Sequence, residues 1–242
     1  IRTEATGYGA VYFLQQMLQQ AGNDIAGKKV AISGSGNVAL YAAEKALDLG
    51  ATVVTLSDST GYIVDDSGID SDKLAWVKDL KFSRFGSLEL YAKEFNVPFH
   101  PQQRPWNVPV DIALPCATQN ELGVADAQAL INNGCIAVAE GANMPTEPKA
   151  AALLQQAGVL YAPGKASNAG GVAVSGLEMS QNSMRQTWTR EQVDIRLKDI
   201  MTQIHHNCLL YGKTPSGAID YVKGASIFGF IKVADALLAF GI

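Results

Sequence analysis

Three small residues at fixed spacing, Gly34, Gly36 and Ala39, could bring a backbone turn close to a negatively charged group. They follow the apolar run 30–32 and open a stretch of helical pattern that extends to about Leu49. Glycine at the first two positions permits a tight turn and lets N–H groups approach a phosphate that a Cβ would hold away. The helix start adds unpaired N–H donors and the positive end of its dipole.

This G-x-G-x-x-A pattern is typical of dinucleotide-binding turns, and a plain βαβ unit without a ligand is the alternative. A second β-type run, 52–56, ends in Ser57-Asp58-Ser59, about 20 residues after the glycines, where such folds bind the adenosine ribose. An acid there favours NAD, because a carboxylate repels the 2′-phosphate of NADP. The predicted contacts so far are Gly34, Ser35, Gly36, Asn37, Val38, Asp58 and Ser59.

Two cations leave the choice between NAD and NADP open. Lys81 and Arg84 lie one turn apart if their segment is helical, and both could then bind one phosphate through charge-assisted hydrogen bonds. A solvated surface pair is the alternative. Ser35 and Ser59 could add hydroxyl donors to the same phosphate.

Composition excludes several classes of function. The chain has 242 residues, of which 48% are hydrophobic, and a net charge of −4, so nucleic acid and anionic membranes are not expected partners. No apolar run approaches the roughly 20 residues of a membrane span. Three widely spaced cysteines give neither a disulfide framework nor a metal-ligand pattern, which favours a cytoplasmic protein without a metal. The histidines at positions 100, 205 and 206 are expected to be structural or exposed.

β-type runs alternate with helical patterns through the first two thirds of the chain, which predicts a Rossmann-like α/β fold: a parallel-rich sheet with helices on both faces. The expected strands are 29–33, 52–57, 97–100, 111–114, 135–139 and 159–161. The expected helices are 6–20, 37–49, 72–80, 87–94, 171–188, 190–211 and 227–240. We therefore expect a dinucleotide-binding domain over 1–175 and an all-helical extension over 176–242.

Polar and small residues follow three of these strands, in the loops 115–121, 140–145 and 163–172. Ligands of open α/β sheets bind at the carboxyl ends of the strands, so we expect the three loops to line one crevice. Asn143 and Asn168 could bind a carboxamide or a ribose there. Their alternative role is to cap helices or fix turns.

Five segments resemble the hexameric glutamate dehydrogenases, and the NADP-linked bacterial branch most of all. They are residues 2–9, 34–39, 114–121, 139–145 and 168–172. The resemblance covers essentially the whole chain and implies the nucleotide-binding domain of such an enzyme. It implies that Thr6, Asn143 and Asn168 surround the nicotinamide and its ribose, and that Ser175 contacts the distal carboxylate of the substrate. It also implies that Lys81 and Arg84 line the 2′-phosphate pocket with Asp58 tolerated, which favours NADP over NAD. Ala117 and Thr118 complete the predicted cofactor contacts.

The same resemblance implies an oxidoreductase that interconverts L-glutamate and 2-oxoglutarate plus ammonia, a homohexamer as the full-length protein, and a last helix that packs on a second domain. The family's catalytic lysine and acid–base aspartate lie in an N-terminal domain, and nothing here matches that motif. Lys165, the one lysine in the three loops, is expected to make a loop contact. We predict no catalytic residue and an inactive half-enzyme cut from a longer protein, since the chain opens at Ile1 without a methionine.

Three other functions share this sequence pattern. They are a nucleotide-binding sensor without enzymatic activity, a related NAD-linked amino-acid dehydrogenase, and an S-adenosylmethionine-dependent transferase. The transferase is disfavoured because a G-x-G-x-x-A turn at a helix start suits a two-phosphate ligand. The sensor is disfavoured because Ser175, Asn143 and Asn168 suit a nicotinamide and a substrate.

Overall fold

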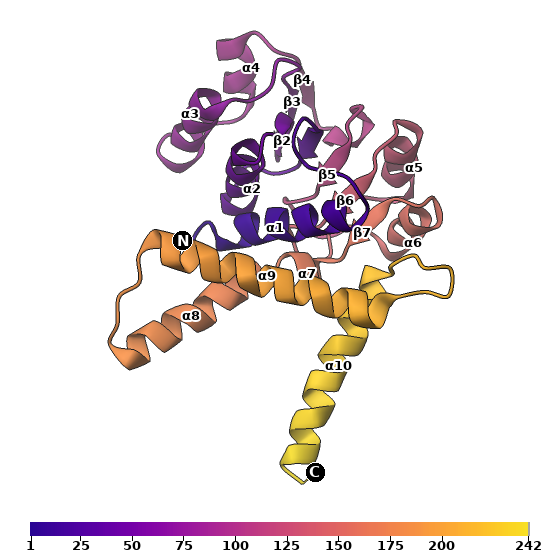
Figure 1. Cartoon of the computed structure of the whole chain (residues 1–242). Helices are drawn as coiled ribbons and strands as arrows, with labels where there is room; N and C mark the ends of the chain where they lie inside the picture. Colours follow the sequence, from indigo (N-terminus) through magenta and orange to yellow (C-terminus); the bar gives the residue numbers. More distant parts are fainter. Residues whose placement is uncertain (242) are drawn as a thin grey trace.

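A computed structural model describes residues 1–241 (Figure 1). This part of the chain contains one seven-stranded sheet in the order β4-β3-β2-β1-β5-β6-β7. The strands are β1 (Lys29–Ile32), β2 (Thr52–Asp58), β3 (Gly61–Val64), β4 (Phe99–Pro101), β5 (Ile112–Leu114), β6 (Ala137–Ala139) and β7 (Leu160–Ala162). From β2 to β7 neighbouring strands pair in parallel, whereas β2–β3 and β3–β4 are antiparallel. The predicted parallel-rich α/β fold is confirmed.

Helices cover both faces of this sheet. In chain order the helical elements are α1 (Ala5–Gln20), α2 (Asn37–Asp48), α3 (Ser71–Phe82), α4 (Glu89–Phe95), η1 (Pro105–Asn107), α5 (Val124–Asn132), α6 (Pro148–Gln156), α7 (Gly164–Ser167), α8 (Gly170–Met184), α9 (Arg190–Gly212) and α10 (Tyr221–Ala239). The helices α5, α6 and α7 and the turn η1 are absent from the sequence-based prediction, and the others match it within a few residues at most ends.

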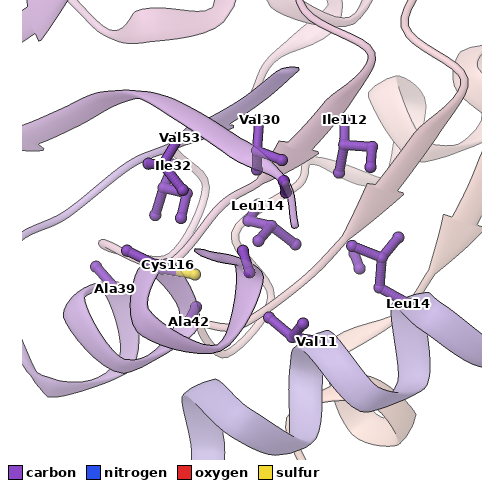
Figure 2. Close-up of a cluster of buried hydrophobic side chains, with 14 of the residues drawn as sticks. Val11, Leu14, Val30, Ile32, Ala39, Ala42, Val53, Ile112, Leu114 and Cys116 are labelled. Atoms are coloured by element: carbon purple, nitrogen blue, oxygen red, sulfur yellow. The ribbon is translucent and has the colours of Figure 1, made fainter. Parts of the chain in front are cut away.

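Alternation along the strands divides the core in two. Val30 and Ile32 of β1 point to the face covered by α1 to α4, and Ala31 between them points to the face covered by η1, α5 and α6. Figure 2 shows the first of these layers, where Val11 of α1 and Ala42 of α2 meet the side chains of β1 and β5. All of these side chains are buried, as a parallel sheet covered on both faces requires.

An antiparallel hairpin extends the sheet beyond β2 and was not expected from the sequence. Its turn, Ser59-Thr60, leads into Gly61, whose φ of +154° lies in the region that favours glycine. A Cβ built on Gly61 would lie 2.3 Å from the carbonyl oxygen of His100 in β4. Glycine at this position therefore lets β3 approach β4 closely.

Helix α1 is enclosed by elements that come much later in the chain. It packs on the sheet side with α2, and on its outer side with α8 and α9 (Figure 1). Tyr12 of α1 donates to Asp194 of α9 at 2.8 Å. Where α1 crosses α8, a Cβ on Gly9 would lie 2.9 Å from the Cα of Gly170. Two glycines thus set the short distance between these helices.

Helix α10 points away from the rest of the chain (Figure 1). It begins at Tyr221, six residues before the expected start, and its first turns pack on α9. Phe230, Leu238 and Phe240 are 73%, 73% and 82% exposed. The helix is therefore not folded back on its own domain. No helix within residues 1–241 is both long and apolar enough to cross a membrane.

The end of α3 and the course of α8 bear on two expectations from the sequence. Helix α3 ends at Phe82 and is capped by Ser83, so Arg84 lies beyond the helix and does not share a helical face with Lys81. Helix α8 runs without a break through residue 175, where the expected boundary between domain and extension falls. The last strand ends at Ala162, and the elements that follow through residue 241 are helices joined by loops, one of which is closed by an isolated β-bridge between Lys213 and Ile219.

Candidate functional site

The glycine turn sits at the carboxyl end of β1 and is held from both neighbouring strands. The N–H of Gly34 donates to Oγ of Ser57 in β2 at 2.7 Å. On the other side, Oγ of Ser33 accepts from the N–H of Cys116, which follows β5, at 2.9 Å. Gly34 has φ +90°, and a Cβ there would lie 3.0 Å from the carbonyl oxygen of Cys116. Both the conformation and the close approach require glycine.

Gly36 leaves open space at the start of α2. It is the N-cap residue, and within residues 1–241 a Cβ built on it would meet no atom within 4 Å apart from those of Gly36 and its chain neighbours. Gly36 and Asn37 are exposed, Ser35 is buried and Val38 is half-buried. The first N–H groups of a helix have no intrahelical acceptor and carry the positive end of its dipole. The space and the donors together fit a pyrophosphate.

Asp58 ends β2, as predicted, but its carboxylate is already engaged. Nζ of Lys81 donates to it at 2.7 Å, the N–H of Leu88 at 2.8 Å, and Thr60 through both its N–H (2.9 Å) and its hydroxyl (2.6 Å). Burial alone would raise the pKa of Asp58, but the bonds from Lys81, Thr60 and Leu88 outweigh it, so the pKa is lowered. The carboxylate is therefore ionised, and Lys81 balances its charge. Its oxygens bind Thr60 and Leu88 in the segments next to it.

The structure separates the two predicted phosphate-binding cations. Lys81 is bound to Asp58 and to the carbonyl oxygen of Gly86. Arg84 instead pairs with Asp79 at 2.9 Å, and its guanidinium lies 4.6 Å from the ring centroid of Trp76. The expectation that both face one point from a shared helix is wrong, because α3 ends between them.

The loops after β5 and β6 are joined at the same edge of the sheet. Ala117 and Thr118 are exposed there. Asn120 and Met144 both have positive φ, +54° and +48°, and the N–H of Asn120 donates to the carbonyl oxygen of Met144 at 3.0 Å. Left-handed conformations of non-glycine residues are uncommon and cluster at functional sites.

Asn143 and Asn168 are brought into contact, from the loops after β6 and after α7. Nδ2 of Asn168 donates to Oδ1 of Asn143 at 2.8 Å and to the carbonyl oxygen of Ala142 at 3.1 Å. Asn143 is exposed and Asn168 is half-buried. Neither residue is an N-cap of α7 or α8, where Pro163 and Ala169 take that position, but Asn168 is the C-cap residue of α7. The bonds of its side chain join two loops, which also fits the alternative role of fixing turns.

Thr6 and Ser175 approach the same corner from α1 and α8. A Cβ built on Gly171 would lie 2.3 Å from Oγ1 of Thr6, so the threonine fills the space that this glycine leaves. One turn further along α8, Oγ of Ser175 donates to the carbonyl oxygen of Gly171 at 3.1 Å. Both hydroxyl side chains are half-buried.

Glu140 organises the last two loops and was not singled out from the sequence. It is 3% exposed. Its carboxylate accepts from the hydroxyl of Tyr161 and the N–H of Gly164, each at 2.5 Å, and from the N–H of Thr146 at 3.2 Å. A signal was available, since an acid directly after an apolar strand has to find donors if it turns inward.

The other residues of interest lie apart from this cluster. Lys165 donates to Oγ of Ser226 in α10, which agrees with the expected loop contact. His205 is buried against the hydroxyl of Tyr221 at 3.1 Å, and burial lowers the pKa of His205 to about 4. A cavity of about 900 Å³ between the amino end of β7 and the 213–220 loop is lined by none of the predicted site residues. In residues 1–241 no three His, Cys, Asp or Glu side chains could hold one metal ion.

A glycine turn between β1 and α2, an open helix start and polar loops at the same edge of a parallel sheet are features typical of dinucleotide-binding α/β domains. The particular family follows from the sequence model that matches. The chain belongs to the glutamate/leucine/phenylalanine/valine dehydrogenase family, whose model matches residues 1–241.

Similar proteins are named as glutamate dehydrogenases. The NAD(P)-specific enzyme of Xylanibacter ruminicola and the NADP-specific enzyme of Escherichia coli K12 are each 58% identical over the whole chain, which covers 54% of each relative. The glutamate dehydrogenase structure of Plasmodium falciparum superposes with a TM-score of 0.96 at 44% identity, covering the whole chain and 52% of that protein. The chain therefore spans about half the length of the relatives that it matches.

Proposed function

We propose that this chain is the NADP(H)-binding half of a glutamate dehydrogenase. The observation that carries the proposal is the open glycine turn at Gly36, placed at one sheet edge with the contact between Asn143 and Asn168. The names of the similar proteins support the same activity. The reaction converts L-glutamate, NADP⁺ and water to 2-oxoglutarate, ammonium, NADPH and a proton.

The residues present fit this cofactor. The N–H groups at the start of α2 suit the pyrophosphate, and the space at Gly36 admits it. The amide groups of Asn143 and Asn168 suit the carboxamide or ribose of the nicotinamide half. Ala117 and Thr118 are exposed at the neighbouring strand end, and Thr6 of α1 packs against the start of α8. When bound, the cofactor supplies or accepts the hydride.

The state of Asp58 favours NADP. Lys81 neutralises this carboxylate, and Thr60 and Leu88 occupy its oxygens, so it is not a free acceptor for ribose hydroxyls. The repulsion that an acid at this place exerts on a 2′-phosphate is correspondingly reduced. Lys81, Ser35, Ser59 and, after a rotamer change, Arg84 are the proposed phosphate contacts. NAD remains the second cofactor because the relative from Xylanibacter ruminicola is named NAD(P)-specific.

The chain's part in catalysis is to bind and orient. Ser175 is proposed to contact the distal carboxylate of glutamate, and no residue of the chain is proposed as acid or base. Those groups are expected on a separate N-terminal domain, against which α10 would pack through its exposed apolar side chains. The same proposal includes a division into a dinucleotide-binding domain over 1–175 and a helical extension over 176–242, and a homohexamer as the full-length protein. It also includes a cytoplasmic location, where the buried thiols remain reduced.

Ligand titration tests the binding function directly. The purified chain should bind NADPH more tightly than NADH, and should not bind S-adenosylmethionine. Gly36→Val should abolish NADPH binding and shift the thermal midpoint little, because the added side chain enters open space that the pyrophosphate needs. Gly229→Val, which also adds a side chain to open space but in α10, is the matched control. Normal NADPH binding by Gly36→Val would contradict the site.

An activity assay tests the half-enzyme part. With NADPH, ammonia and 2-oxoglutarate the isolated chain should stay at background, because a hydride donor alone cannot polarise the keto group or move protons to the amine. Clear turnover would contradict this part of the proposal. Tight NADPH binding by a full-length protein that also lacks turnover would indicate a nucleotide sensor.

A further inference from the structure

Glu121 is a buried carboxylate in the loop after β5 that the proposed chemistry does not use. Its residue is 2% exposed, and no cationic group of residues 1–241 forms an ion pair with it within 4.0 Å. Burial raises the pKa of Glu121, and its hydrogen bonds offset this only in part. Burying a charge without a counter-ion costs folding free energy, so the burial of Glu121 calls for a functional explanation.

Three donors converge on one oxygen of this carboxylate. Oε1 of Glu121 accepts from Oγ of Ser33 at 2.8 Å, from the N–H of Ala117 at 3.0 Å and from the N–H of Thr118 at 3.3 Å. Ser33 directly precedes Gly34 of the glycine turn, and its hydroxyl also accepts from the N–H of Cys116. One carboxylate therefore ties the loop that carries Ala117 and Thr118 to the turn at the start of α2.

The charged and titratable groups that face Glu121 are few. The guanidinium of Arg104 attracts it from the segment before η1 and donates to the main-chain oxygen of Glu121 rather than to its carboxylate. The thiol of Cys116 is the other neighbour, and burial with the charge of Glu121 raises the pKa of that thiol, which therefore stays neutral. The hydrogen-bond strength of the loop thus depends on the protonation state of Glu121 itself.

We infer that Glu121 is a positioning residue for NADP(H): its carboxylate fixes the 115–120 loop against the glycine turn, so that Ala117 and Thr118 meet the cofactor in a preformed arrangement. The inference rests on the proposed function. Hydrogen bonds to an ionised acceptor are roughly twice as strong as neutral ones, so the loop is held best when Glu121 is charged. Preforming a binding loop raises affinity, because less ordering remains to be done on binding.

The test compares NADPH affinity between the wild-type chain and Glu121→Gln over a range of pH. Glutamine keeps an acceptor oxygen and the shape of the side chain but removes the charge. At pH 8 the variant should bind NADPH about tenfold more weakly. The ratio of the two affinities should fall toward one as pH decreases through the pKa of Glu121, above the usual range of a glutamate. The 2′-phosphate titrates equally in both proteins and cancels in this ratio.

Two further variants separate positioning from stability. Glu94→Gln removes one exposed negative charge and should leave the affinity and its pH dependence as in wild type. Ser33→Ala removes one of the three donors and should weaken NADPH binding about threefold. If Glu121→Gln does not fold, Ser33→Ala becomes the deciding variant. Unchanged NADPH affinity in Ser33→Ala would then overturn the inference.

The outcomes distinguish the two proposals. A wild-type chain that does not bind NADPH overturns the proposed function and this inference with it. A wild-type chain that binds NADPH, while Glu121→Gln binds equally well or differs by a factor that does not change with pH, overturns the positioning role alone.

Discussion

Two aspartate–lysine pairs at the two ends of α3 have the same bond length and different roles. Lys81, in the last turn of α3, binds Asp58 at 2.7 Å, and Lys73, in its first turn, binds Asp65 at 2.7 Å. Both aspartates belong to the hairpin of β2 and β3 or directly follow it. The pairs therefore differ in their surroundings rather than in their own geometry.

In the pair of Asp65 the carboxylate is buried, whereas Lys73 reaches it from the surface. The side chain of Asp65 is 1% exposed and also accepts from the hydroxyls of Tyr91 (2.7 Å) and Ser67 (2.5 Å). These bonds join the end of the hairpin to α3 and α4. The pair of Asp58 lies at the carboxyl edge of the sheet, beside the exposed Ser59 and across from the glycine turn. Position in the sheet, and not the ion pair, separates a proposed cofactor contact from a structural bond.

Removing the buried aspartate should have the largest effect on stability. Asp65→Ala leaves the buried hydroxyl of Tyr91 without its acceptor and Lys73 without its counter-ion, so it should lower the free energy of unfolding by about 3–5 kcal/mol. The ratio of NADPH to NADH affinity should not change in the folded fraction. Asp66→Ala, which removes an adjacent exposed carboxylate, is the control in chemical denaturation. A loss as small as that of the control would show that the Asp65 pair is not structural.

Removing the cations at the sheet edge should act on binding instead. Lys81→Gln with Arg84→Gln should weaken NADPH binding by about 2–4 kcal/mol, the strength of two charged hydrogen bonds, and NADH binding much less. Calorimetric titration with both cofactors measures this difference. Lys93→Gln, an exposed cation paired within α4, controls for the loss of charge. Equal losses for the two cofactors would assign Lys81 to structure, like Lys73.

Acid should weaken both pairs. Burial acts to raise the pKa values of Asp58 and Asp65. Hydrogen bonds, first of all those from Lys81 and Lys73, stabilise the charged carboxylates more strongly, so both pKa values are lowered. A depressed pKa contributes stability above the ordinary value of 3.8, and this contribution is lost as pH falls through the folded-state pKa. Asp65→Asn should therefore flatten the acid side of the stability profile. If the stability of Asp65→Asn falls with acid as steeply as that of the wild type, the stabilising role of the Asp65 carboxylate is contradicted.

Arg84 alone should have the smallest effect on stability. It is 46% exposed at the side chain and pairs with Asp79, which is 57% exposed, so Arg84→Gln should change the free energy of unfolding by less than about 1 kcal/mol. If Arg84→Gln has an effect larger than this, the effect should be on NADPH affinity and not on stability. If NADPH affinity is also unchanged, Arg84 belongs to the solvated surface and Lys81 acts without it.

The fold was largely predictable because its signals are local. The apolar runs of β1, β2 and β5 and the glycine turn between β1 and α2 each lie within a few residues in the sequence. The hairpin strand β3 gave no such signal, because Gly61 and the polar turn before it are typical of a loop. The sequence predicts the end of helix α3 at Leu80, two residues before Phe82, and leaves the helical state of the segment up to Arg84 as a condition. Its capping residue, Ser83, is not distinctive in sequence, so the sequence alone does not separate Lys81 from Arg84.

The residues of the candidate site could be predicted from the sequence, but the hydrogen bonds that hold them could not. Sequence order places Asn143 and Asn168 at strand ends, and the structure brings them into contact. No local pattern indicates that Asp58 is bound by Lys81, or that Glu121 and Glu140 turn inward. Such bonds join residues far apart in the chain, up to 88 positions in the case of Ser33 and Glu121. They depend on the assembled sheet, which spacing alone does not describe.

The enclosure of α1 by α9 has a consequence for how the protein is made. Tyr12 and its partner Asp194 are 182 residues apart. At translation rates of about 5–20 residues per second, α1 leaves the ribosome about 10–40 seconds before the helix that covers it. During that interval Val11, Leu14 and the other apolar groups of α1 have only part of their native contacts. The chain therefore cannot complete its core in the order of synthesis, and its folding should depend on slow, long-range closure.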